Sequence, residues 1–141
     1  MGEEETYYID ANVFIYAAIN DGSLGEKCRA ILKAAQNGQI VGRTSCLTFD
    51  EVLWYIRKAQ PEAMQTVGNN LLSLNIRFLT VDKMVLYQSL VAILESHLKP
   101  RDAIHVATMK LQNIKNIISE DKDFDRIIDI KRIDIEDVAI E

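Results

Sequence analysis

Short apolar runs of strand type alternate along this chain with longer segments of helical spacing. The runs are rich in residue types that favour strands, and they fall at residues 7–9, 40–41, 76–79 and 116–119. Residues 127–128 and 131–133 are expected to add a further strand near the end. Strands that alternate with helices favour a parallel sheet with helices on both faces. The pattern therefore predicts an α/β fold with a central, mainly parallel sheet of about four to five strands, flanked by helices.

The helical segments carry recognisable signals at their ends. Asn37 and Gly38 end the helix expected at residues 26–35, and Pro61 ends the helix expected at residues 47–59. Asp82 is expected to cap a long helix whose apolar residues match one face, namely Leu86, Leu90, Ile93, Leu94 and Leu98. Further helices are expected at residues 13–19, 61–72 and 100–111.

The length of 141 residues fits a single domain, with fraying expected only at residues 1–5 and 135–141. No apolar run approaches the ~20 residues that a membrane span needs, and no signal peptide is visible. Cys28 and Cys46 are expected to be small buried thiols and not a disulfide framework. These features predict a cytoplasmic protein that does not associate with membranes.

The net charge of −5 leaves two interpretations open. One is a metabolic enzyme or an interaction module, because a protein that binds nucleic acid over its whole surface is usually basic. The other is that several carboxylates converge on metal ions, which then supply the positive charge that a phosphate group needs. The placement of the acidic residues has to decide between these interpretations.

Three aspartates stand at the ends of predicted elements. Asp10 directly follows the strand at residues 7–9, and Asp121 follows the strand at residues 116–119. In a parallel sheet the carboxyl ends of the strands share one edge, where ligands bind. Asp102 lies in the first turn of a largely apolar helix, which favours partial burial. Each has a structural alternative: a helix cap for Asp10, a solvated turn for Asp121 and a favourable helix dipole for Asp102.

Glu51 is the most ambiguous acidic residue. Thr48 followed by Glu51 matches a capping box, and Asp50 is an alternative acid beside it. His105 shares a helix face with Asp102 and could line a site, but a packed helix histidine is the commoner case, so we leave it out of the predicted set.

Separated carboxylates of this kind suit one chemistry well. Mg²⁺ prefers carboxylate and water oxygens, and two such ions can clamp the attacking and leaving oxygens of a phosphodiester. The sequence has no phosphate-cradling glycine loop, no nucleophile elbow and no zinc-ligand spacing. The acidic residues therefore favour metal-assisted hydrolysis.

Four segments resemble the motifs of the PIN-domain family. Residues 8–16 are similar to its opening motif, an apolar strand that ends in aspartate, and residues 101–107 are similar to its third motif. Residues 48–52 resemble the second motif, with Glu51 in the acidic position. Residues 119–124 resemble the fourth, in which threonine is commoner than Ser119 and the first acid of the run is the usual ligand. The resemblance runs from about residue 7 to residue 133.

The resemblance implies a single Rossmann-like PIN domain over residues 1–141 that hydrolyses RNA with Mg²⁺, for which Mn²⁺ substitutes. Domains of this length resemble VapC-type toxins, which a small antitoxin protein inhibits and which are often homodimers. Asp10 and Asp102 would bind the metal directly, while Glu51 and Asp121 would complete its shell. Asp123 is an alternative or an addition to Asp121. Two smaller polar residues would hold carboxylates or waters, and these are Asn12 and Ser119.

Two other functions stay open on the sequence alone. One is an RNA-processing nuclease without an antitoxin, and the other is a PIN fold that binds RNA or protein without cutting. Tyr16 and Trp54 could stack on an RNA base, although packed aromatic residues are commoner. Candidate cations for an RNA path, each more often a plain surface charge, are Arg43, Arg57, Lys58, Lys99, Arg101 and Lys122.

Overall fold

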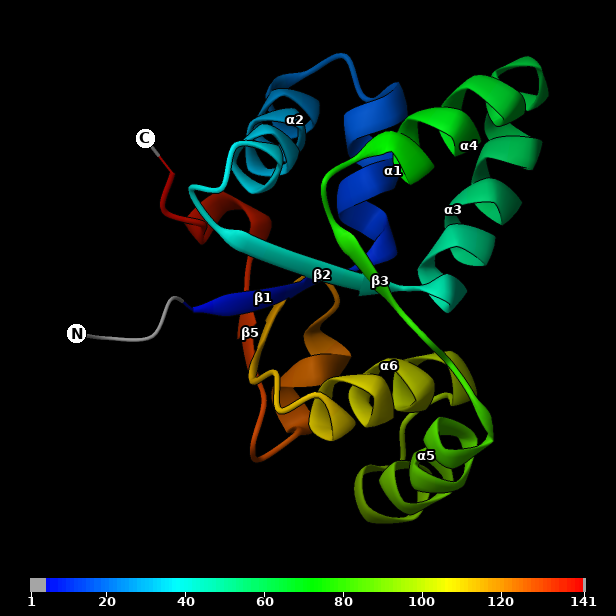
Figure 1. Cartoon of the computed structure of the whole chain (residues 1–141), viewed down its shortest axis with the longest axis vertical. Coiled ribbons are helices and arrows are strands. Elements are labelled where there is room, and N and C mark those ends of the chain that lie inside the picture. The colour runs from blue at the N-terminus through cyan, green and yellow to red at the C-terminus, as the bar shows by residue number, and fades with distance from the viewer. Residues whose placement is uncertain (1–4, 141) are drawn as a thin grey trace.

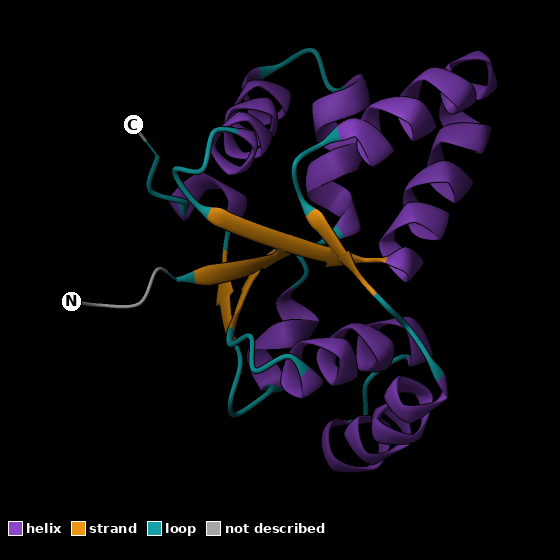
Figure 2. Cartoon of the chain, in the orientation of Figure 1, coloured by secondary structure: helices purple, strands orange, loops and turns teal. Residues whose placement is uncertain are grey.

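The computed structural model describes residues 5–140 and contains a five-stranded parallel sheet (Figure 2). The strand order is β3-β2-β1-β4-β5. This arrangement confirms the predicted α/β fold. The strands are β1 (Thr6–Ile9), β2 (Val41–Ser45), β3 (Arg77–Leu79), β4 (Asn116–Ile118) and β5 (Lys131–Ile133).

Strand β1 lies at the centre of the sheet, and the order in which successive strands are added reverses beside it. Tyr8 pairs with Arg43 of β2 on one side and with Ile117 of β4 on the other. The chain first builds β2 and β3 outward from β1 and then crosses over to build β4 and β5. In open α/β sheets, ligands bind beyond the carboxyl ends of the strands at such a reversal, which here lies between β1 and β4.

The helices form one layer on each face of the sheet (Figure 1). One face is covered by α1 (Ala11–Ile19), α2 (Ser23–Gln36), α3 (Cys46–Ala59) and α4 (Met64–Ser73). The other face is covered by α5 (Lys83–Ser96) and α6 (Pro100–Leu111). Short 3₁₀ helices complete the fold: η1 (Pro61–Ala63), η2 (Lys122–Arg126) and η3 (Ile135–Asp137).

Each face of the sheet has its own apolar core because successive strand residues point to opposite sides. Ile9 and Ile118 pack under the layer of α1 to α4, whereas Tyr8 and Ile117 pack against α5 and α6. The chemistry at the helix ends also follows the sequence. Asp82 Oδ1 accepts a hydrogen bond of 3.1 Å from the Val85 amide and so caps α5.

Several local expectations differ from the structure. The minimal strand at residues 40–41 extends to Ser45, because pairing with β1 and β3 holds residues that do not favour strands by themselves. Residues 127–128 form no strand, and only residues 131–133 pair with β4. Ser45, not Thr48, stands at the start of α3, so no capping box forms. The thiol of Cys46, in the first turn of α3, is exposed, whereas Cys28 is buried as expected.

The C-terminal segment packs against the fold, contrary to the fraying expected there. Ile135 and Val138 are buried, and Lys27 Nζ donates a hydrogen bond of 2.8 Å to the Val138 carbonyl. The same expectation for residues 1–4 lies outside the described part of the chain. Within residues 5–140, no helix combines the length and the apolar character required of a membrane span.

The apolar face of α5 does not point wholly into the core. Leu98, just beyond the helix, is buried and Ile93 is partly buried, but Leu86, Leu90 and Leu94 are exposed. Small residues fill the inward positions instead, because α5 packs closely on α6 through Ser89 and Ala92. Part of the expected core stripe is therefore a surface feature of this layer.

Candidate metal centre

Asp10 occupies the junction between β1 and α1 at the carboxyl edge of the sheet. Its backbone amide donates to the Ile118 carbonyl at 3.1 Å, which extends the pairing of β1 with β4. Oδ1 accepts a hydrogen bond of 2.8 Å from the Ala11 amide, so the residue does cap α1. Oδ2 faces Ser119 and Asn12. The capping role and the site role are thus carried by different oxygens of one buried carboxylate.

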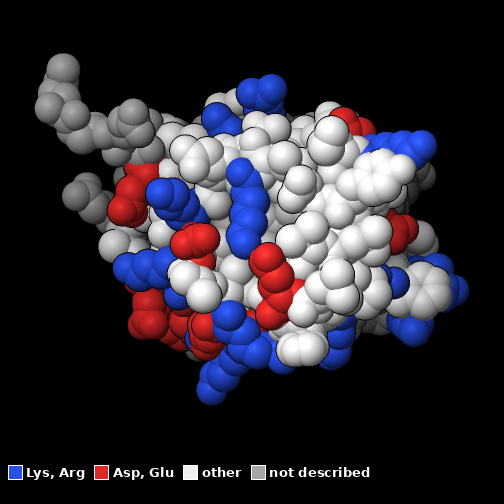
Figure 3. Space-filling model, turned by 90° about the horizontal axis from the view of Figure 1, so that it is seen from below, with Lys and Arg blue, Asp and Glu red and all other residues white. Residues whose placement is uncertain are grey.

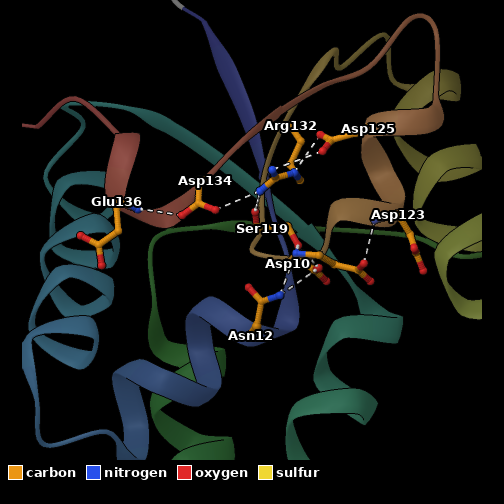
Figure 4. Close-up of polar contacts among 9 residues, drawn as sticks. Asp10, Asn12, Ser119, Asp123, Asp125, Arg132, Asp134 and Glu136 are labelled. Carbon is orange, nitrogen blue, oxygen red and sulfur yellow. Dashed lines mark hydrogen bonds and ion pairs between the residues drawn. The ribbon is translucent and has the colours of Figure 1, made fainter.

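Ser119, directly after β4, joins three groups of the site (Figure 4). Its hydroxyl donates to Asp10 Oδ2 at 2.6 Å and accepts from Asn12 Nδ2 at 3.2 Å and from the Asp121 amide at 3.0 Å. Ser119 is fully buried, so these contacts are shielded from water. The Oδ1 atom of Asn12 is buried and has no hydrogen-bond partner among the described residues.

A second group of carboxylates comes from α6 and from the turn after β4. Ligand oxygens of Asp102, Asp121 and Asp123 all lie within 4.8 Å of one another. Burial, together with the negative charges of Asp121 and Asp10, raises the pKa of Asp102 to about 6. The Asp123 amide also donates to Asp121 Oδ1 at 2.9 Å, so the turn places both acids on one side. Asp121 and Asp123 therefore belong to the same group of carboxylates.

Glu51 on α3 reaches the same region from the opposite layer. One of its oxygens, a carboxylate oxygen of Asp10 and a nitrogen of His105 lie within 4.8 Å of one another. Glu51 Oε1 is 2.5 Å from His105 Nε2. Asp50, the alternative acid, is exposed and belongs to neither group. The structure thus brings all four predicted acids, Asp10, Glu51, Asp102 and Asp121, to one edge of the sheet.

His105 is buried as expected, but it also contacts the acidic site. Its Nδ1 atom lies 2.5 Å from the hydroxyl of Tyr8, which in turn lies 2.8 Å from Ser45 Oγ. Burial lowers the pKa of His105, but the hydrogen bond to Glu51 and the charge of Asp10 outweigh burial, so the net shift is upward. Its position one helical turn from Asp102 was the only sequence signal for this role.

Arg132 on β5 is a further contributor that sequence reasoning missed. Its guanidinium donates to the Ser119 carbonyl at 3.0 Å, to Asp134 Oδ2 at 3.1 Å and to both oxygens of Asp125 (Figure 4). These bonds fix the backbone at the end of β4, from which Ser119 projects. No local pattern announces this role, because it depends on β5 pairing beside β4.

The donor set fits a hard divalent cation. Two groups of carboxylates face a common region, and burial together with their mutual repulsion raises the pKa of Asp102. A cation would remove that repulsion, and the unpaired Asn12 Oδ1 offers a further oxygen for a ligand or a bound water. Asp10, Glu51, Asp102 and Asp121 are therefore suitable ligands for Mg²⁺ or Mn²⁺, with Asp123 beside them.

Comparison with protein families decides the class of this fold. The model of the PIN domain matches residues 7–129. The chain belongs to the PIN-domain family. A comparison of this PIN domain with curated proteins found no match.

Solved structures share the architecture of this PIN domain at low sequence identity. The toxin VapC20 of Mycobacterium tuberculosis, which cleaves the sarcin-ricin loop, superposes with a TM-score of 0.70 at 17% identity, over 84% of this chain and 92% of the toxin. A toxin–antitoxin complex from Klebsiella pneumoniae gives 0.68 at 22% identity, over 89% and 95% of the two chains. VapBC2 of Rickettsia felis, bound to promoter DNA, gives 0.70 at 13% identity, over 92% and 98%. These likenesses show that this PIN domain shares its overall fold with the three structures.

Proposed function

We propose that this PIN domain is a Mg²⁺-dependent endoribonuclease, and that it acts in the cytoplasm as the toxin of a toxin–antitoxin pair. One observation carries the proposal: acids separated by as many as 111 residues of sequence, Asp10 to Asp121, meet at the carboxyl edge of the sheet where the strand order reverses. Open α/β sheets bind their ligands at this position. Burial and the neighbouring charges of Asp121 and Asp10 raise the pKa of Asp102 and disfavour its charged state, a cost that a bound cation would remove.

We assign different roles to the side chains of the site. Asp10 and Asp102 would bind the metal directly, with Glu51 and Asp121 completing the set. When bound, Mg²⁺ supplies a Lewis acid for the phosphate and an activated water as nucleophile. Ser119 and Asn12 hold Asp10 in one orientation by hydrogen bonds. Three exposed cations lie next to Asp102 and Asp121 in sequence and would contact RNA phosphates, and these are Lys99, Arg101 and Lys122.

An antitoxin partner is supported by the neighbours and by an apolar groove. Several similar folds are the toxin chains of toxin–antitoxin complexes. In this chain a groove of about 360 Å³ runs between α1, α2 and α4. Apolar side chains such as Phe14, Leu32 and Val67 line it, which suits the apolar side of a bound peptide segment. We place the antitoxin contact in this groove.

The exposed leucines of α5 support a homodimer. Leu86, Leu90 and Leu94 form an apolar stripe on the side of the molecule that carries α5 and α6. Figure 3 views that side and shows a broad area without charged side chains. A contiguous exposed apolar surface of this kind is more often an interaction site than a surface that stays in contact with water. A twofold axis beside α5 would bury the same stripe from both protomers.

Two alternatives make different predictions. A PIN fold that only binds RNA or protein has no need for every acidic position to be filled and assembled, as they are in this chain. An RNA-processing nuclease without an antitoxin would cleave RNA but would not arrest growth in a way that a neighbouring small protein relieves. A small reading frame just upstream, whose co-expression relieves growth arrest, would separate a toxin from the latter.

The decisive test replaces Asp10 by asparagine. Asn also caps helices well, so α1 should keep its cap while the site loses one carboxylate charge. We expect Asp10→Asn to abolish Mn²⁺-dependent cleavage of RNA and to leave the circular dichroism spectrum unchanged. Asp50→Asn is the matched control, because it removes the same charge from an exposed position beside Glu51. Cleavage by Asp10→Asn at the wild-type rate would refute the assignment.

A further inference from the structure

Neither ring nitrogen of His105 is free in this structure. Nε2 contacts Glu51 Oε1 at 2.5 Å, and Nδ1 contacts the Tyr8 hydroxyl at 2.5 Å. The ring is fully buried and lies edge-on to the Tyr8 ring, with 5.4 Å between the ring centroids. Distance alone would allow His105 to be a third metal ligand beside Asp10 and Glu51. A metal-binding nitrogen needs a lone pair, so the positions of the protons decide its role.

Counting protons places a hydrogen on Nε2 in each arrangement that the contacts allow. A carboxylate such as Glu51 only accepts hydrogen bonds. If Tyr8 donates to Nδ1, a neutral ring carries its proton on Nε2. If Tyr8 donates to Ser45 Oγ, at 2.8 Å, then Nδ1 must donate to Tyr8, and Nε2 must still be protonated to meet Glu51. In neither case does His105 offer a lone pair to a cation.

We infer that Tyr8 and His105 form a positioning pair for Glu51. The Tyr8 hydroxyl fixes the orientation of the imidazole, and the Nε2 proton holds Glu51 Oε1, so that Oε2 is left outside this hydrogen bond. His105 is therefore a positioning residue and not a metal ligand. The hydrogen-bonded pair itself does not depend on the enzyme's activity, but its role toward a cation rests on the proposed function.

The geometry of strand β1 explains how Tyr8 comes to lie beside the acidic site. Tyr8 and Asp10 are two residues apart in extended backbone, so their side chains leave β1 on the same side of the sheet. Strand β1 thus supplies one acid directly and orients a second through His105. The chain of contacts links β1, α6 and α3, with Ser45 at the end of β2 also touching Tyr8. Placement of Glu51 therefore depends on both helical layers.

The direct test is nitrogen-15 NMR of the wild-type protein, whose other histidine is the exposed His97. In metal-free protein we expect a protonated Nε2 on His105, with a slowly exchanging proton resonance. Addition of diamagnetic Mg²⁺ should leave Nε2 protonated. A proton-free or metal-bound Nε2 would overturn the inference. Because the first measurement uses metal-free protein, it decides the hydrogen-bond arrangement even if the proposed nuclease function is wrong.

A pair of tyrosine variants tests the consequence for metal binding. Tyr8→Phe removes the hydroxyl that holds His105, while Tyr7→Phe removes a hydroxyl that bonds the exposed Glu5 on the other side of the same strand. Calorimetric titration should show about tenfold weaker binding of both Mg²⁺ and Mn²⁺ by Tyr8→Phe, and unchanged binding by Tyr7→Phe. Equal affinities in the two variants would exclude a positioning role. Absence of cation binding by the wild type would instead count against the proposed function.

Discussion

The hydroxyl of Ser119 donates a hydrogen bond of 2.6 Å to Oδ2 of Asp10, across 109 residues of sequence. The contact joins the first and last acidic motifs of the chain through one buried side chain. It also depends on the pairing of β1 with β4, which brings Ile9 beside Ile118. The central pair of strands therefore sets the geometry of the acidic site.

Ser119→Ala should weaken the metal site more than it weakens the fold. The substitution leaves Asp10 Oδ2, Asn12 Nδ2 and the Asp121 amide without their common partner. We expect metal affinity and RNA cleavage to fall about 10–100-fold and the free energy of unfolding to fall by about 1–3 kcal/mol. Calorimetry and chemical denaturation measure these quantities. Ser119→Thr keeps the hydroxyl and should retain most of the activity; wild-type metal affinity in Ser119→Ala would contradict the prediction.

Asp102 should make the metal-free protein less stable as the pH rises. Its pKa is raised from the ordinary value of 3.8 to about 6 in the folded chain, so the folded state binds more protons in that window. The stabilising contribution is complete below pH 3.8 and is lost as the pH rises through about 6. In EDTA at neutral pH, Asp102→Asn should therefore be more stable than wild type by about 1 kcal/mol, after allowance for solvent screening.

The advantage of Asp102→Asn should shrink between pH 7 and pH 5, a window set around the raised pKa of about 6. Thermal unfolding of both proteins in EDTA at several pH values measures the difference. Asp50→Asn serves as the control, because its side chain is exposed and outside the acidic groups. A stability difference that does not vary with pH would show that Asp102 has an ordinary pKa.

Leu90→Asp should convert the proposed dimer into monomers. Leu90 lies in the middle of the α5 stripe and is 57% exposed, so a charge there would be buried by a second protomer but harmless in a monomer. Light scattering coupled to size exclusion measures the mass directly. Leu72→Asp is the matched control, since Leu72 is 62% exposed on α4. An unchanged mass for Leu90→Asp would exclude this face as the interface.

The predictable parts of this molecule are those governed by local pattern. The alternation of strands and helices correctly predicted the parallel sheet. Aspartates that directly follow strands, such as Asp10, lie at the expected edge of that sheet. Helix ends with a strong local cause were also foreseen, as at Gly38, whose backbone has a positive φ of 81°. In these cases neighbouring residues supply the whole physical reason.

The parts that were missed depend on distant partners. The capping box expected at Thr48 does not form, because α3 begins earlier, with Ser45 as its N-cap. The hydroxyl of Ser45 is hydrogen-bonded to Tyr8 of another strand. The contact of His105 with Glu51 and the bonds of Arg132 to Ser119 join elements far apart in sequence. The inward face of α5 was decided by close packing on α6, which allows small residues such as Ala92 inside and leaves Leu90 outside.

The two hydrogen-bonded oxygens of Asp10 have a consequence for how tightly an ion is captured. One oxygen is tied to the first turn of α1 and the other to Ser119, so the carboxylate cannot rotate about its bonds. Its loss of freedom is complete once the chain has folded. An arriving ion therefore meets a rigid, preorganised acceptor, and little entropy remains to be lost when it is captured.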